Sequence, residues 1–276
     1  MKKFIIKFIL LVIIIVTSTL LYARYIETNR LVTKEIPVID NKINDDFDGL
    51  KIVHISDTHY KRVITEKYLN KLSKEINLLN PDIVVFTGDL IDKDSNITDN
   101  DITILKNFLN SINYKYGKYA VIGNHDYAID IDTLNRIYNE SNFKLLDNEV
   151  DIIYSKNNNK LYLGGISTGN FTDDDISKMI VNEDIYKILL FHEPDYVSDL
   201  RSINANLLLS GHSHNGQVNI PILKKSFLPK NATKYYEEYY NINGTKMYIS
   251  SGIGVSRVNF RLFNPPKINF YRINKN

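Results

Sequence analysis

Residues 50–59 read LKIVHISDTH, an apolar run followed at once by a polar cluster. The same order recurs at residues 83–92, which read IVVFTGDLID, and at residues 119–126, which read YAVIGNHD. A short apolar run bounded by glycine and polar residues is typical of a buried strand. These stretches therefore predict strands that each end in side chains capable of chemistry.

The segments between these strands show helical periodicity. Leu69, Leu72, Ile76 and Leu79 fall on one helical face, and Pro81 then precedes the next strand. Further helices are expected at residues 102–112 and 131–138, and further strands around residues 145–146 and at residues 161–164, 188–191, 207–209 and 247–250. Strands that alternate with helices predict a layered α/β fold, with helices outside packed sheets.

Polar clusters also follow two of the later strands, at His192 and at residues 211–214, which read GHSH. Because the carboxyl ends of parallel strands share one crevice, we expect all five clusters to converge in space. Imidazole, carboxylate and amide groups suit zinc, iron or manganese. The candidate metal ligands are Asp57, His59, Asp89, Asn124, His192, His212 and His214.

Five of the six histidines come directly after a strand, whereas His54 lies inside one and is predicted to pack in the core. Asp126 has either a supporting or capping role at the cluster or a purely structural one. The Lys224–Lys225 pair is expected to be solvated, and the tyrosine-rich residues 235–240 are interpreted as an edge strand or a surface loop.

Composition excludes several function classes. The formal net charge is only +2, from 34 basic and 32 acidic residues, so no overall field attracts nucleic acid, and an anionic substrate must be captured locally. The chain has no cysteine, which excludes a disulfide framework, a thiolate metal site and a cysteine nucleophile.

The N-terminus predicts a membrane anchor. Lys2, Lys3 and Lys7 lie around the start of a mostly apolar run that ends at Arg24, and such a run can span a bilayer as a helix. A cleaved signal peptide is the rival interpretation, but no good Ala-x-Ala site is present. We predict an anchor or uncleaved signal at residues 1–24, a connector at 25–49 and a catalytic domain at 50–276.

Basic residues flank the apolar run on both sides, so the positive-inside rule gives almost no bias. The position of the anchor and the lack of cysteine favour a single-pass protein of the cell membrane with an extracytoplasmic domain.

The five linked clusters resemble the calcineurin-like metallophosphoesterase superfamily, whose pattern is Asp-x-His, Gly-Asp, Gly-Asn-His-Asp/Glu, a lone His and Gly-His-x-His. The resemblance covers roughly residues 50–273 and implies an αββα fold of two packed mixed sheets flanked by helices. Residues 211–217, which read GHSHNGQ, together with residues 251–254, Arg261 and Pro265–Pro266, resemble a branch of membrane-anchored or exported bacterial phosphodiesterases and pyrophosphohydrolases.

The resemblance implies two divalent metal ions bridged by Asp89, with Mn²⁺ favoured over Zn²⁺ or Fe²⁺. One ion would be held by Asp57, His59, Asp89 and His214, and the other by Asp89, Asn124, His192 and His212. The ions would activate water and neutralise charge on phosphoryl oxygens. His125 would protonate the leaving oxygen or stabilise its charge, and Asp92 would orient its ring.

Some residues depart from the family pattern, and they bear on which substrate is bound more than on which reaction takes place. Asp92 stands where purple acid phosphatases place a tyrosine, which argues against an iron–tyrosinate centre. Asn215 replaces the usual glycine of the branch, and Lys267 stands where the branch usually has glutamate. The pattern therefore does not predict which substrate is bound.

The predicted function is hydrolysis of a phosphodiester, pyrophosphate or phosphomonoester at the cell envelope, on a phosphorylated small molecule or a lipid-linked substrate. One alternative is a non-catalytic envelope metal-binding module, although seven candidate ligands exceed the four of a closed structural zinc site. The other is a nuclease, against which the anchor and the lack of a basic stripe count, so nucleic acid is not expected as a partner.

Overall fold

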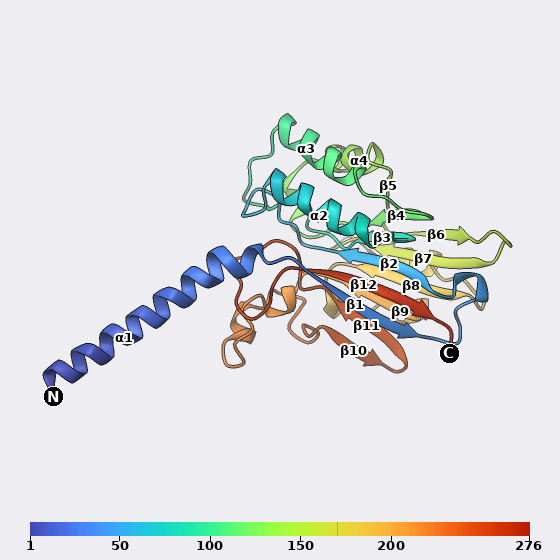
Figure 1. The fold of residues 1–276 in the computed structure, drawn as a ribbon. Coiled ribbons are helices and arrows are strands. Elements are labelled where there is room, and N and C mark those ends of the chain that lie inside the picture. The colour runs from blue at the N-terminus through green and yellow to red at the C-terminus, as the bar shows by residue number, and fades with distance from the viewer. Residues whose placement is uncertain (170) are drawn as a thin grey trace.

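The computed structural model describes residues 1–169 and 171–276, in which two six-stranded sheets pack face to face (Figure 1). The first sheet has the order β1 (Val32–Ile39), β12 (Lys267–Asn274), β2 (Leu50–Ile55), β3 (Ile83–Phe86), β4 (Gly117–Ala120) and β5 (Phe143–Leu145). The second has the order β10 (Tyr239–Ile242), β11 (Thr245–Ile249), β9 (Leu207–Ser210), β8 (Tyr186–Phe191), β7 (Lys160–Ile166) and β6 (Glu149–Tyr154).

Helices cover the outer faces of the two sheets. The first sheet is covered by α2 (Glu66–Leu78), α3 (Asp99–Asn110) and α4 (Ile131–Asn139), and the second by the short α5 (Asp173–Lys178) with neighbouring turns. Each of these helices begins at a Thr or Asp whose side chain accepts a backbone N–H of the first turn. The predicted αββα architecture is confirmed.

Strand periodicity separates the core into layers. Along β2, Val53 and Ile55 pack beneath the helices, whereas Leu50 and Ile52 pack between the two sheets. Successive strand residues point to opposite faces, so this strand is apolar on both sides and contributes to two buried layers at once. In the predicted helical face, Leu69, Leu72 and Ile76 are fully buried, whereas Leu79, directly after the helix, is partly buried.

Some elements were missed from the sequence. The predicted connector at residues 25–49 contains β1, which pairs in parallel with β12 at the edge of the first sheet. In β1 only Ile36 and Val38 are buried, so the apolar alternation that would reveal a strand is short. The strands β6, β10 and β12 and the helix α5 were also not predicted individually, although β10 does place Tyr239 and Tyr240 in an edge strand, as expected.

The prediction that Lys224 is solvated was wrong, because this side chain is only 7% exposed. Its ammonium donates to the carboxylate of Glu237 at 2.6 Å and to the amide oxygen of Asn215 at 3.0 Å. A lysine next to a second lysine gives no sign of burial in the sequence, because Glu237 and Asn215 reach its ammonium only in the folded chain.

The helix α1 (Lys2–Leu21) projects away from the domain with no buried residue (Figure 1). It continues without a break to Asn29, through the π-helical turn Tyr22–Ile26 and the 3₁₀ turn Glu27–Asn29. Within the described residues, this is the one helix long and apolar enough to cross a membrane by length and composition.

We expect Leu72→Ala in α2 to lower the free energy of unfolding by about 2–5 kcal/mol, because it leaves a cavity under the first sheet. Leu78→Ala in the same helix is the control, since Leu78 is 78% exposed and its loss should cost under about 0.5 kcal/mol. Urea unfolding in detergent, followed by circular dichroism, measures both. Equal midpoints for the two variants would contradict the assignment of this helical face to the core.

Candidate metal centre

Loops from both sheets meet at one end of the sandwich. The strands β2, β3 and β4 supply three of these loops, and β8 and β9 supply the other two. The seven side chains predicted as ligands lie there in two buried groups, so the predicted convergence is confirmed.

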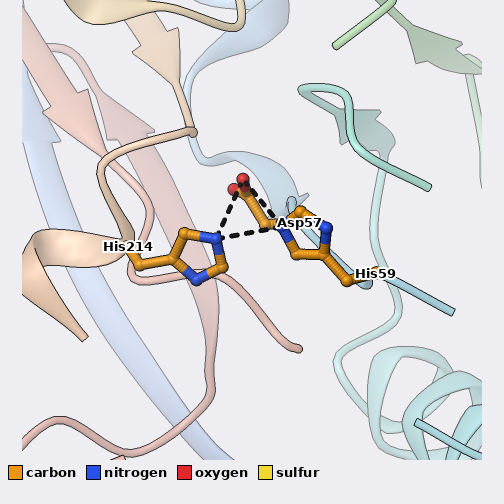
Figure 2. A group of neighbouring side chains, drawn as sticks. All are labelled: Asp57, His59 and His214. Carbon is orange, nitrogen blue, oxygen red and sulfur yellow. Dashed lines mark hydrogen bonds and ion pairs between the residues drawn. The ribbon is translucent and has the colours of Figure 1, made fainter. Parts of the chain in front are cut away.

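The first group consists of Asp57, His59 and His214 (Figure 2). His59 Nε2 lies 3.1 Å from His214 Nε2, and His214 Nε2 lies 3.4 Å from Asp57 Oδ1. The histidines come from different sheets, since His59 follows β2 and His214 follows β9. Two ring nitrogens therefore face each other beside one carboxylate.

The second group consists of Asp89, His192 and His212, with Asn124 beside them. His192 Nε2 lies 3.2 Å from Asp89 Oδ2 and 3.2 Å from the amide oxygen of Asn124. Asp89 also joins the two groups, because the same Oδ2 lies 3.6 Å from His59 Nε2. The position of Asp89 fits a carboxylate shared between two sites.

The donor set fits divalent cations. Burial lowers the pKa of His59 and His212 to about 3 and holds that of His214 well below its usual value, so these imidazoles are neutral at pH 7. Neutral imidazole is the form that binds metal. In the first group, two ring nitrogens converge beside the Asp57 carboxylate, and a cation between them would satisfy all three atoms.

Backbone strain is concentrated in the same loops. Five of the seven predicted ligands have positive φ, which is uncommon for residues other than glycine. They are Asp57 at 52°, His59 at 42°, Asp89 at 60°, His212 at 63° and His214 at 48°. Strain of this kind persists where the surroundings hold the backbone firmly, and it clusters at functional sites.

Two glycines allow the loops to approach closely. A Cβ at Gly123 would lie 2.3 Å from the backbone nitrogen of Asp89, and a Cβ at Gly211 would lie 2.0 Å from Ser56 Oγ. Gly211 follows β9 and Ser56 follows β2, so this contact joins the loops of the two sheets. Any larger residue at either position would separate the ligands.

Backbone carbonyls orient two of the rings. His192 Nδ1 donates to Thr87 O at 2.6 Å, and His212 Nε2 donates to Lys230 O at 2.7 Å. The other nitrogen of each ring, His192 Nε2 and His212 Nδ1, faces the centre and carries the lone pair in the neutral ring. Although burial opposes it, the Asp89 carboxylate raises the pKa of His192 to about 10, so a metal ion at Nε2 would displace a proton.

His125 lies at the rim, with its ring centroid 4.5 Å from that of His59. The backbone N–H of Lys93 donates to His125 Nδ1 at 3.3 Å. Asp92 Oδ2 lies 3.9 Å from His125 Nδ1, 3.6 Å from His59 Nδ1 and 3.2 Å from the Arg62 guanidinium. At these distances Asp92 lies beside both rings without a hydrogen bond to either.

Asp126 has a supporting role that the sequence left open. Its fully buried carboxylate accepts the N–H groups of Asp89 and Gly123 at 2.9 Å, Leu90 at 2.8 Å and Ile91 at 3.3 Å. It therefore joins the loop after β3 to the loop after β4. His54, in contrast, packs between the sheets as predicted and contacts Thr87 Oγ1 at 2.8 Å.

The two groups open onto a cavity of about 460 Å³. Basic side chains line it beside the histidines, namely Arg62, Lys93, Lys230 and Arg257. A smaller hollow next to His212 and His214 is lined by Phe227 and Pro229. The cavity therefore offers basic side chains for an anionic group, with the acidic Asp94 and Glu193 in the same lining, and the adjoining hollow adds some apolar surface.

Comparisons with known proteins agree with this geometry. A family profile described as calcineurin-like phosphoesterase matches residues 50–216, more than half of the chain. The chain is 28% identical over 255 residues to the uncharacterized metallophosphoesterase YkuE of Bacillus subtilis, covering 91% of this chain and 88% of that protein. It is 32% identical over 263 residues to the uncharacterized metallophosphoesterase Cj0846 of Campylobacter jejuni, covering 93% and 67%. It is 26% identical over 309 residues to the UDP-2,3-diacylglucosamine pyrophosphatase LpxG of Chlamydia muridarum, covering 91% of each.

We expect Asp126→Asn to lower affinity for manganese by about 10- to 100-fold, as other losses of supporting contacts around metal ligands do. The new amide group would bring a donor against N–H groups that need an acceptor. Asp130→Asn is the matched control, because Asp130 caps α4 through one N–H and asparagine caps equally well. Calorimetric titration with Mn²⁺ measures both affinities, and unchanged affinity in Asp126→Asn would contradict the role given to this carboxylate.

Proposed function

The chain belongs to the calcineurin-like phosphoesterase family, and we propose that it hydrolyses a phosphodiester or pyrophosphate bond in a lipid-linked substrate at the membrane that holds α1. The observation that carries the catalytic part is the pair of buried ligand groups joined by Asp89. A closed structural zinc site would need one group of four ligands and no cavity beside it.

In this proposal, Asp57, His59, Asp89 and His214 hold one ion, and Asp89, Asn124, His192 and His212 hold the other. Two divalent ions bound there supply Lewis acidity that activates water and neutralises phosphoryl charge. Asp92 Oδ2 lies 3.6 Å from His59 Nδ1, an atom with no hydrogen-bond partner among the described residues. Asp92 therefore lies where it can support the ligand His59 as well as face His125.

His125 is the proposed proton donor. Because Nδ1 accepts the Lys93 N–H, the neutral ring carries its proton on Nε2. From Nε2 the ring can donate to the oxygen that leaves phosphorus, as a general acid does. Arg62 and Arg257 lie on the same cavity and provide charge for a second phosphate group.

The substrate class is supported by three observations. Four basic side chains line the cavity, and Phe227 and Pro229 contribute apolar surface to the small hollow beside it. The relative from Chlamydia muridarum is named as a pyrophosphatase of a diacylated nucleotide sugar. The helix α1 would keep the domain beside lipids, and the domain is proposed to lie outside the cytoplasm.

We expect a His59→Ala plus His214→Ala variant to lose more than about 100-fold of manganese-dependent hydrolysis of bis-p-nitrophenyl phosphate, because one ion loses two of its ligands. The assay uses the full chain in detergent, and elemental analysis of the same samples counts bound metal.

His54→Gln is the control for this experiment, since His54 is buried but lies outside both groups. It should retain its metal ions and most of its activity. Equal activity in the double variant and the wild type would contradict the proposed site. One tightly held ion per chain without turnover would instead favour a non-catalytic binding module.

We expect Val12→Lys plus Ile14→Lys to release the protein from membranes, because each lysine at the centre of a bilayer costs about 3 kcal/mol on insertion scales. Alkaline carbonate extraction followed by immunoblotting measures this, with Val12→Leu plus Ile14→Leu as the control. A wild-type chain that is itself extracted, or one whose mature N-terminus begins after Ala23, would argue against the anchor.

A further inference from the structure

Exposed apolar side chains gather where α1 joins the domain. Tyr25 and Ile26 are 65% and 58% exposed, and Phe263 is 66% exposed. Ile222 and Leu223, just before the 3₁₀ turn Lys224–Phe227, are 90% and 46% exposed. Large apolar side chains exposed together mark an interaction surface.

A small buried cluster places these side chains around the end of α1. Ala23 is fully buried against Val218 and Leu262, and Ile220 and Phe227 pack on the same cluster. Ile222 lies in the chain between Ile220 and Phe227, and Phe263 directly follows Leu262. In Figure 1 the loop between β9 and β10 lies beside the end of α1.

The connection between α1 and the domain has no flexible linker. Thr28 Oγ1 donates to Ala23 O at 2.7 Å and accepts the N–H of Arg261 at 3.0 Å. The carboxylate of Glu27 accepts the N–H of Asn264 at 2.7 Å, and both side chains of this pair are buried. The position of the exposed loop relative to α1 is therefore fixed by the fold.

Sheet register places the metal centre at the same end of the molecule. Val32, the first residue of β1, pairs with Lys267, and Asn269 of β12 pairs with His54 near the end of β2. The chain therefore leaves α1 at the end of the first sheet where the loop with Asp57 begins. The carboxyl end of β2 lies on the side of the domain from which α1 projects (Figure 1).

We propose that Ile222, Leu223 and Phe263 form a membrane-docking surface that inserts into the interfacial layer of the bilayer that holds α1. This inference rests on the proposed anchor. The partner of the docking surface is a lipid bilayer, because the surface is continuous with the end of α1. Tyr25, Arg24 and the exposed Lys225 suit the headgroup layer, where tyrosine and basic side chains are favoured.

The ion pair of the buried Lys224 with the half-exposed Glu237 holds the docking surface against the metal centre. The same ammonium contacts Asn215, the residue after His214. Phe227, in the same 3₁₀ turn as Lys224, lines the hollow beside the ligands. A phosphate group at the bilayer surface would therefore reach the centre along the loop that docks.

Single tryptophans test the inference, because the chain has none of its own. We expect Ile222→Trp and Phe263→Trp, each in the full chain in phosphatidylcholine–phosphatidylglycerol vesicles, to show blue-shifted emission that brominated acyl chains quench. Phe8→Trp, within α1, is the positive control. Leu78→Trp is the negative control, because it is exposed at the C-terminal end of α2, near the start of β3 and away from the metal centre.

Quenching at Phe8, Ile222 and Phe263 without quenching at Leu78 would support the docking surface. Quenching at Phe8 with none at Ile222 or Phe263 would overturn it and leave the anchor standing. No quenching at Phe8 would overturn both, because α1 would then lie outside the bilayer. Hydrolysis of bis-p-nitrophenyl phosphate by the same samples reports separately on the proposed catalytic function.

Discussion

The buried carboxylate of Asp126 is the contact on which the arrangement of the candidate centre depends. It gathers N–H groups from the loops after β3 and β4, and among them is the N–H of Asp89, the residue shared by the two ligand groups. Several backbone donors on one carboxylate favour its charged form without a basic partner, although burial and the charge of Asp89 raise the pKa of Asp126 to about 7. The loops can then keep strained φ values because this buried contact and the sheets beneath them leave little alternative.

The packing of the two sheets also determines where the predicted ligands lie. His59 belongs to the loop after β2 and His214 to the loop after β9, so their contact exists only when the sheets are stacked. The close approach of Gly211 to Ser56 fixes the separation of those loops. A buried core between the sheets therefore acts directly on ligand geometry, and damage to that core would appear as damage to the centre.

Much of this arrangement could be predicted because its signals are local. An apolar strand followed by His or Asp is visible in the sequence, and the convergence of strand ends is a general property of α/β folds. The role of Asp126 could not be predicted in full, since its partners become neighbours only when two loops meet. The strand β1 was hidden because an edge strand buries few side chains, and the burial of Lys224 depends on Glu237, which lies in a different segment of the chain.

The unbroken course of the chain from α1 into the first sheet has a kinetic consequence. A domain held at one height above a surface meets its targets by lateral diffusion, so its rate would depend on molecules per unit of membrane area and not on their bulk concentration. Without a tether to extend, it would have almost no reach toward molecules away from that surface. Selectivity among substrates would then depend first on whether they lie in the same membrane, and only afterwards on contacts with the site.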